Sequence, residues 1–333
     1  MPFKWSINPY SGCAHGCHYC YARAYYPLQA ERSRQQRAAE QSRPCSCNQQ
    51  GCHSCYARAY HLRAEHGNGD EDFETQILVK TNVVEVLRRE LARPSWRGEQ
   101  AAIGTSTDAY QPAEGRFRLT RGVLEALRDA ANPVGMVTKS PMIQRDLDVL
   151  ADLARLTKVR IFFTITTIDL GLWRTLEPGT ANPFKRLQAL RLLRQAGVPC
   201  GVLLAPILPG ITDSVESIEA VARAAAEYGA LFFGSSGLRL APVVKEHYLG
   251  FVGERFTDLL PRYQRAYSGV YAPREYLSRL DQRVERIRAR YGFADDSMRK
   301  GELVPASPAA ESRLRRAGGQ LALPLPDGSS MSS

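Results

Sequence analysis

Three cysteines near the start of the chain have the types and the spacing to do metal chemistry. Cys13, Cys17 and Cys20 form a C-x3-C-x2-C triplet, and the aromatic residue Tyr19 directly precedes the last of them. Three thiolates from one short loop are one protein ligand short of closing a tetrahedral zinc site or a four-iron, four-sulfur cube. If a small molecule supplies the missing ligand, one metal position stays open for chemistry.

A structural zinc knuckle is the alternative interpretation of the triplet. It needs a fourth Cys or His, for which His15 and His18 are the nearest candidates, although both lie inside the tight loop and would compete with it sterically. A disulfide scaffold is not expected. No apolar run near Met1 is typical of a signal peptide, so a reducing cytoplasm is the expected compartment.

The residues around the triplet resemble a known family. The string Ile7-Asn8-Pro9-Tyr10 before it and Tyr21-Ala22-Arg23 after it resemble the radical S-adenosylmethionine (radical SAM) superfamily, in its spore photoproduct lyase-like, DNA repair photolyase branch, over residues 3–292. The resemblance implies that the three thiolates hold a 4Fe–4S cluster whose fourth iron chelates S-adenosyl-L-methionine (SAM). It further implies that a reductant such as flavodoxin or ferredoxin supplies an electron that cleaves SAM to a 5′-deoxyadenosyl radical, which abstracts hydrogen from the substrate.

The elements that must position this loop can be read from the apolar runs. Strands are expected at 5–8, 101–105, 133–138, 159–167, 198–205 and 231–235. Thr120 is expected to cap a helix over 121–130, while Ser140 and Asn182 each precede a proline at a first helical turn, and Gly197 ends a helix. Strands separated by helices indicate parallel pairing. The fold class is therefore α/β, and the resemblance implies a partial (β/α)6 TIM-like barrel.

Length and composition set the outer limits. The chain has 333 residues, enough for one such barrel with a tail, and no apolar run long enough to span a membrane. Its 44 Lys and Arg against 34 Asp and Glu give a net charge of +10, which favours polyanions, including nucleic acid. We expect the barrel at 1–240, a helical C-terminal extension at 241–292 and a disordered tail at 293–333. Met1 lies a few residues before the first strand, whereas this family usually has a longer N-terminal segment that would cover the open side of the barrel.

Barrel enzymes place their sites at the C-terminal ends of the strands. Polar strings follow strands two to five there, at 104–114, 138–140, 164–169 and 205–213. By resemblance, SAM would be cradled by Tyr19, Thr107, Asp108, Thr166, Arg186 and the turn from Pro206 to Gly210. Arg186 could instead pair only with Glu177, and Thr107-Asp108 could simply terminate a strand.

A second, degenerate copy of the cysteine motif follows the first. Residues 16–26 recur at 51–61 with nine of eleven positions identical, so residues from about 24 to 58 indicate a tandem duplication inserted into the barrel. In this copy Cys47 and Cys52 are separated by four residues, and Ser54 replaces the aromatic. One extra residue moves a thiolate by up to about 3.6 Å, against metal–ligand tolerances of about 0.2 Å. We therefore assign the SAM cluster to the first copy. The hypothesis for the second set of cysteines is that it binds zinc or an auxiliary iron–sulfur cluster, and the alternative is free thiols on an exposed loop. The cysteines of this set are Cys45, Cys47, Cys52 and Cys55.

The tail contains one motif. The hexapeptide from Gln320 to Leu325, between glycine-containing flanks, resembles the segment with which bacterial polymerase and repair proteins dock on the sliding clamp. A glutamine for a polar contact and three leucines for an apolar cleft suit a short extended ligand. A chance match in a low-complexity tail is the alternative.

These observations favour a radical SAM enzyme that acts on nucleic acid, with damaged DNA preferred. One departure matters: the cysteine that returns hydrogen in the spore lyase has its counterpart here at Gly104, or at most at Ala102-Ile103. Thymine-dimer reversal by the lyase's route is therefore not expected, unless a residue such as Tyr110 donates the hydrogen. Radical SAM modification of tRNA or a protein, and a non-enzymatic zinc-binding adaptor docked on the sliding clamp, are the alternatives.

Overall fold

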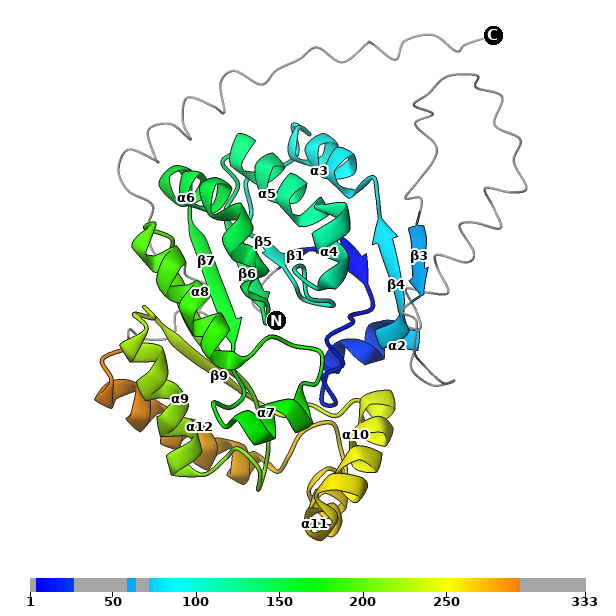
Figure 1. Cartoon of the computed structure of the whole chain (residues 1–333), viewed down its shortest axis with the longest axis vertical. Helices are drawn as coiled ribbons and strands as arrows, with labels where there is room; N and C mark the ends of the chain where they lie inside the picture. Colours follow the sequence, from blue (N-terminus) through cyan, green and yellow to red (C-terminus); the bar gives the residue numbers. More distant parts are fainter. Residues whose placement is uncertain (1–3, 27–58, 64–71, 294–333) are drawn as a thin grey trace, which may run out of the picture.

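The computed structural model describes residues 4–26, 59–63 and 72–293. At its centre lies a six-stranded parallel sheet (Figure 1). The strands run in the order β1 (Trp5–Ile7), β5 (Ala101–Ile103), β6 (Val134–Thr138), β7 (Val159–Thr164), β8 (Cys200–Ile207) and β9 (Phe233–Gly237). Every neighbouring pair is parallel, and among the described residues β1 and β9 do not pair with each other. The predicted α/β class and the six strands are confirmed, and the open sheet matches a partial barrel.

Helices cross over between these strands and cover the sheet. They are α3 (Val83–Leu91), α4 (Pro112–Phe117), α5 (Leu119–Asp129), α6 (Leu147–Leu156), α7 (Leu170–Leu176), α8 (Pro183–Gln195) and α9 (Val215–Glu227), with a 3-10 turn η2 at Pro141–Asp146. The main core lies between them and the sheet, where Leu124, Phe163 and Leu190 are fully buried. Because the crossovers occupy one side, the C-terminal ends of all six strands meet at one edge of the sheet.

Three of the four residues that were predicted to mark the start or end of a helix do so in the structure. The Ser140 and Asn182 side chains accept hydrogen bonds from backbone N–H groups two residues on, and Gly197 follows α8 with a φ of +83°. The Thr120 prediction is wrong, because α5 begins one residue earlier, at Leu119. The buried Glu114 carboxylate accepts from Thr120 N at 2.9 Å and so takes over the capping role.

The sequence patterns missed a second, three-stranded antiparallel sheet. Its order is β2 (Tyr10–Ser11), β4 (Gln76–Lys80) and β3 (Ala59–Arg63), accompanied by η1 (Tyr21–Tyr25) and the short α2 (Asp72–Thr75). β2 pairs with β4 immediately before Cys13, and the Lys80 backbone N donates to Pro9 O at 3.0 Å. This small sheet therefore fixes the direction in which the chain enters the cysteine motif. The inserted segment predicted at about 24–58 lies largely outside the described residues, which resume at β3.

Beyond β9, helices α10 (Pro242–Arg255), η3 (Thr257–Leu259), α11 (Leu260–Ala266) and α12 (Arg274–Arg290) complete the described chain. α12 packs against α9 and β9, and α10 packs against η1, beside the cysteine motif (Figure 1). Within the described ranges, no helix combines the length and the apolar character that a membrane crossing requires.

Candidate active site

The cysteine motif forms a loop, residues 12–20, that is fastened at the C-terminal edge of the sheet. We call it the cysteine loop. On the β5 side, Gly12 O accepts hydrogen bonds from Thr107 Oγ1 at 2.6 Å and from Gln111 Nε2 at 3.0 Å. The Gln111 side-chain oxygen in turn accepts from Ala14 N at 3.1 Å. The polar string after strand two, which the sequence placed at this edge, thus holds the start of the loop.

The segment after α7 holds the other side of the cysteine loop. His18 N donates to Leu176 O at 3.3 Å, and Gly179 N donates to His15 O at 3.0 Å. A Cβ atom at Gly179 would lie only 2.5 Å from Ala14 O, so a side chain there would push the loop away. The close approach explains why glycine occupies this position.

Glycine is also needed where the loop begins. Gly12 has a φ of +82°, and a Cβ atom there would lie 2.8 Å from Gln76 O and 2.9 Å from Phe73 O. Cys13 N donates to the same Phe73 carbonyl at 2.8 Å. The backbone at Cys13 is therefore set by contacts with α2 and with the first residue of β4.

The three thiols of the loop are free and lie near one another. Cys13 and Cys17 are each 6% exposed, and Cys20 is partly buried. Burial, together with the charge of the neighbouring thiolates, raises the pKa of Cys17 and of Cys20. Burial would also raise the pKa of Cys13, but the adjacent His15 cation outweighs it and lowers that pKa.

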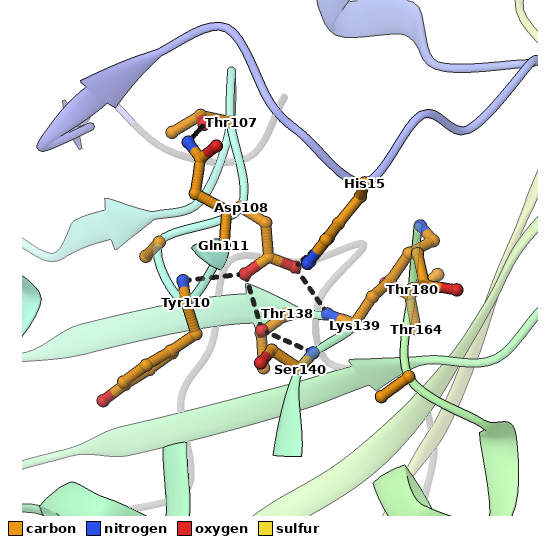
Figure 2. A network of polar contacts seen from close by, with 12 residues as sticks. His15, Thr107, Asp108, Tyr110, Gln111, Thr138, Lys139, Ser140, Thr164 and Thr180 are labelled. Carbon is orange, nitrogen blue, oxygen red and sulfur yellow. Dashed lines mark hydrogen bonds and ion pairs between the residues drawn. The ribbon is translucent and has the colours of Figure 1, made fainter. Parts of the chain in front are cut away.

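His15 is committed to a buried carboxylate (Figure 2). Its Nδ1 lies 3.4 Å from Asp108 Oδ2, and both side chains are less than a tenth exposed. Asp108 also accepts from Tyr110 N at 2.8 Å, Thr138 Oγ1 at 2.7 Å and Lys139 N at 2.7 Å. Although burial acts in the opposite direction, the His15 charge and these donors lower the pKa of Asp108 to about 2. Asp108 therefore joins the ends of β5 and β6 to the cysteine loop and does more than terminate a strand.

His18 is committed to an aromatic stack. Its ring lies on Phe251 of α10, with centroids 4.0 Å apart and planes 9° apart, and near His247 at 5.6 Å. The contacts of both histidines tie the cysteine loop to neighbouring elements, His15 through Nδ1 and His18 through the face of its ring. Within the described segments, no three His, Cys, Asp or Glu side chains, the loop cysteines included, are arranged to hold a single metal ion.

Tyr19, the aromatic of the motif, reaches into a buried polar network. Its hydroxyl hydrogen-bonds Thr166 Oγ1 at 2.9 Å and donates to the Glu177 carboxylate. Glu177 pairs with Arg186 at 2.5 Å, and their side chains are 2% and 1% exposed. Burial alone would raise the pKa of Glu177, but the charges of Arg186 and Lys139 lower it to about 2. An ionised carboxylate therefore lies directly behind the cysteine loop.

Arg186 uses its whole guanidinium inside the protein. Besides Glu177, it donates to Ala181 O at 2.8 Å, Thr164 O at 2.9 Å and Thr180 Oγ1 at 2.5 Å, and it is fully buried. The structure thus contains the Glu177 pairing that was the alternative for this residue. Through Glu177, Arg186 holds the hydroxyl of Tyr19 in place.

Lys139 is a site residue that the sequence did not single out. It is the first residue after β6, and its Nζ lies 5.7 Å from the centroid of the Tyr19 ring. Burial would lower its pKa, yet the charges of Cys17 and Glu177 raise it. The signal that could have found it is its place in the polar string at the end of strand three. It puts a cation beside the second cysteine.

The remaining predicted cradle residues lie along the same edge. Thr166 Oγ1 donates to Ala205 O at 3.2 Å and so links the ends of β7 and β8, and Pro206 follows within β8. Gly210 lies farther out: it is exposed, has a φ of +77°, and its N donates to Asp213 Oδ1 at 2.8 Å.

Two positions bear on hydrogen return to a product radical. Tyr110 lines an open pocket of about 520 Å³, together with His15, Ser140 and Gly179. Its side chain is nevertheless buried, and its hydroxyl donates to Asp146 Oδ2 at 3.0 Å. Gly104 has a φ of +84°, and a Cβ atom there would lie 2.3 Å from Val137 O. Gly104 therefore has no room for a side chain.

Comparison with known proteins decides the family. The model of the radical SAM superfamily matches residues 44–225, more than half of the chain. The chain belongs to the radical SAM superfamily. The uncharacterized protein Rv2578c of Mycobacterium tuberculosis is 34% identical over 315 residues, which are 94% of this chain and 80% of the relative. The uncharacterized protein MJ0683 of Methanocaldococcus jannaschii is 23% identical over 210 residues, 63% of this chain and 62% of that protein.

Solved structures share the fold. A spore photoproduct lyase variant with bound AdoMet and dinucleoside spore photoproduct matches with a TM-score of 0.58 at 17% identity, over 86% of this chain and 73% of that one. This likeness shows a shared fold, and the radical SAM match confirms the predicted superfamily and an enzyme. Membership implies a 4Fe–4S cluster and SAM as cofactors. The matched region begins at Pro44, so it includes the second cysteine copy and not the first.

The donor set of the first copy fits such a cluster. It offers three free thiols from one loop whose backbone is hydrogen-bonded to its neighbours. Three cysteine ligands match a four-iron cluster whose remaining iron takes a ligand from elsewhere. The cysteines of the second copy lie outside the described residues.

Proposed function

We propose that Cys13, Cys17 and Cys20 hold the 4Fe–4S cluster of this radical SAM enzyme, and that the enzyme acts on nucleic acid, with damaged DNA as the preferred substrate. The observation that carries the first part is the fixed cysteine loop. Its hydrogen bonds join it to the segment after β5, to the end of α7 and to α2, so it lies at the edge where parallel-sheet enzymes bind ligands.

The cofactors, when bound, supply an electron and a 5′-deoxyadenosyl radical through reductive cleavage of SAM. The protein's own side chains supply position and charge. Glu177 and Thr166 fix Tyr19, and Asp108 fixes His15, so the loop enters catalysis with little left to reorganise. Lys139 is the cation best placed for an anionic group beside Cys17, and we assign it the carboxylate of SAM.

Charge and likeness support a nucleic-acid substrate. The net charge of +10 favours a polyanion. A neighbour of the same fold is a lyase whose structure contains a dinucleoside lesion. By the resemblance, the lyase cysteine that returns hydrogen corresponds to Gly104, or at most to Ala102-Ile103, and a side chain at Gly104 would overlap Val137 O. The proposal therefore concerns a radical reaction on nucleic acid that returns hydrogen by another route.

Two further predictions fall outside the described residues and stay predictions. One is the second metal site of Cys45, Cys47, Cys52 and Cys55, and the other is the sliding-clamp motif from Gln320 to Leu325. Both can be tested only in the full-length protein.

Release of 5′-deoxyadenosine tests the proposal. Full-length protein, reconstituted without oxygen and supplied with SAM and a reductant, should release it, and ultraviolet-damaged DNA should increase the rate. Cys13→Ala should abolish release. Release that responds to tRNA and not to damaged DNA would overturn the DNA preference, while equal release by Cys13→Ala would overturn the cluster assignment.

A further inference from the structure

An exposed tyrosine and an arginine are held side by side at the edge of the active site. Arg239 and Tyr271 form an isolated antiparallel bridge, and Leu240 N donates to Val270 O at 2.8 Å. We call residues 239–240 and 270–271 the rim bridge. The Tyr271 side chain is 54% exposed although the backbone beneath it is fixed. A rigid support with an exposed ring is what a stacking contact needs, because little conformational entropy is lost on binding.

The rim bridge lies beside the cysteine loop. Arg239 follows the C-terminal end of β9, and its neighbours Leu238 and Leu240 belong to the same buried cluster as Cys17 and Tyr19. Tyr21 directly follows Cys20, packs edge-on against Tyr25 with centroids 6.4 Å apart, and donates to Thr105 O at 2.5 Å. Among the described residues, no ion pair joins the Arg239 guanidinium to a carboxylate.

Positive charge is concentrated in this part of the chain. Residues 239–293 contain eleven Lys or Arg against six Asp or Glu, whereas residues 72–238 contain twenty against eighteen. Two of these cations lie near the same edge: Arg255 ends α10, whose Phe251 stacks on His18, and Arg262 Nη1 would lie 3.5 Å from a Cβ atom at Gly210. Both suit a polyanion.

We propose that the rim bridge is a stacking site for one unpaired base of single-stranded DNA, with the Tyr271 ring against the base and the Arg239 guanidinium on the adjacent phosphate. The proposal rests on the nucleic-acid function and adds where the strand lies. An enzyme that acts on a base must take it out of the helical stack, and an aromatic ring beside a cation gives an unstacked nucleotide a sequence-tolerant contact. A protein side-chain substrate would not need an aromatic ring beside a cation.

Fluorescence anisotropy with a short labelled DNA strand tests the site in full-length protein. Tyr271→Ala should weaken binding roughly 5- to 150-fold, the range for loss of one base–aromatic stack. Tyr271→Phe keeps the ring and should bind like the wild type. Leu231→Ala is the matched control, because Leu231 is 40% exposed but precedes β9, at the opposite end of that strand. Arg239→Ala should reduce the slope of log K against log salt by about 0.7, one phosphate contact on a single strand.

Each outcome separates this site from the wider proposal. Unchanged binding by Tyr271→Ala, with wild-type affinity intact, would overturn the stacking site and leave the nucleic-acid function standing. Absence of DNA binding by the wild type would overturn both. Tyr271→Ala should also release 5′-deoxyadenosine from SAM alone at the wild-type rate and melt at the wild-type temperature. A loss of either would mean that Tyr271 acts on the fold or the cluster and not on the strand.

Discussion

Replacement of Arg186 by methionine should destabilise the protein far more than it weakens SAM binding. Arg186 and Glu177 form an ion pair with side chains 1% and 2% exposed, and removal of one partner from such a buried pair costs about 3–5 kcal/mol, because the other charge is left uncompensated. For a domain of this size, 1 kcal/mol lowers Tm by roughly 2–4 °C. The expected fall in Tm is therefore on the order of 6–20 °C.

The double variant Arg186→Met with Glu177→Leu isolates the pair. It removes both charges and should recover part of the stability, since a buried ion pair contributes little beyond apolar groups of similar volume. Circular dichroism melts of the wild type, both single variants and the double variant give the coupling energy. We expect it to exceed about 1 kcal/mol, as for residues in direct contact. SAM affinity, measured by calorimetry on the reconstituted protein, is the second readout.

The result that would refute this reasoning is specific. If Arg186→Met melted within about 2 °C of the wild type but lost most of its SAM affinity, Arg186 would contact SAM directly, and its partnership with Glu177 would be incidental. Loss of stability with near-normal affinity at low temperature would support its role as a residue that positions Tyr19.

Three further predictions follow from single contacts. Gly104→Ala should lower the free energy of unfolding, measured by chemical denaturation, by about 1–3 kcal/mol more than Gly197→Ala does. The two glycines have nearly equal φ angles, +84° and +83°, but only a Cβ atom at Gly104 would overlap a neighbour. Equal losses in the two variants would contradict this. The pKa of the Asp108 carboxylate is lowered from 3.8 to about 2, so this group should contribute stability that is present above pH 3.8 and lost as the pH falls toward 2. Asp108→Asn should flatten that part of the curve of stability against pH. An unchanged curve would argue against the charged pair of Asp108 and His15. Phe251→Leu should lower the free energy of unfolding by about 0.5–1.5 kcal/mol more than the loss of buried apolar area accounts for, because His18 loses its stacking partner. In a His18→Leu background, the same substitution should show no such excess.

The sequence predicted the parts of the fold that depend on local pattern. Apolar runs located the parallel strands, and most clearly β5 and β7, which are buried throughout and therefore need an uninterrupted apolar segment. Capping residues and Gly197 marked helix ends for the same local reason. The small antiparallel sheet was missed because β3 and β4 lie beside the inserted segment, where no pattern shows that Tyr10 will pair with Val79.

The site shows the same division. Spacing alone identified the cysteine loop, because metal ligands must come from one tight turn. Sequence could not show that His15 would meet Asp108, or that Glu177 would meet Tyr19, since these partners are far apart along the chain and are brought together only by the ends of different strands. Glu177 was named as a partner for Arg186, but its contact with Tyr19 depends on three-dimensional packing. Lys139 was overlooked for the same reason: its charge matters only beside Cys17.

The central claim is that the first cysteine copy, and not the second, carries the SAM cluster. The superfamily match begins at Pro44 and therefore includes the second copy, so the two copies must be tested against each other. The direct measurement is the iron content and the electron paramagnetic resonance spectrum of reduced full-length Cys17→Ala and Cys52→Ala, each with and without SAM. The account predicts that Cys17→Ala loses the SAM-responsive 4Fe–4S signal, whereas Cys52→Ala keeps it. A SAM-responsive signal that survives in Cys17→Ala and disappears in Cys52→Ala would contradict it.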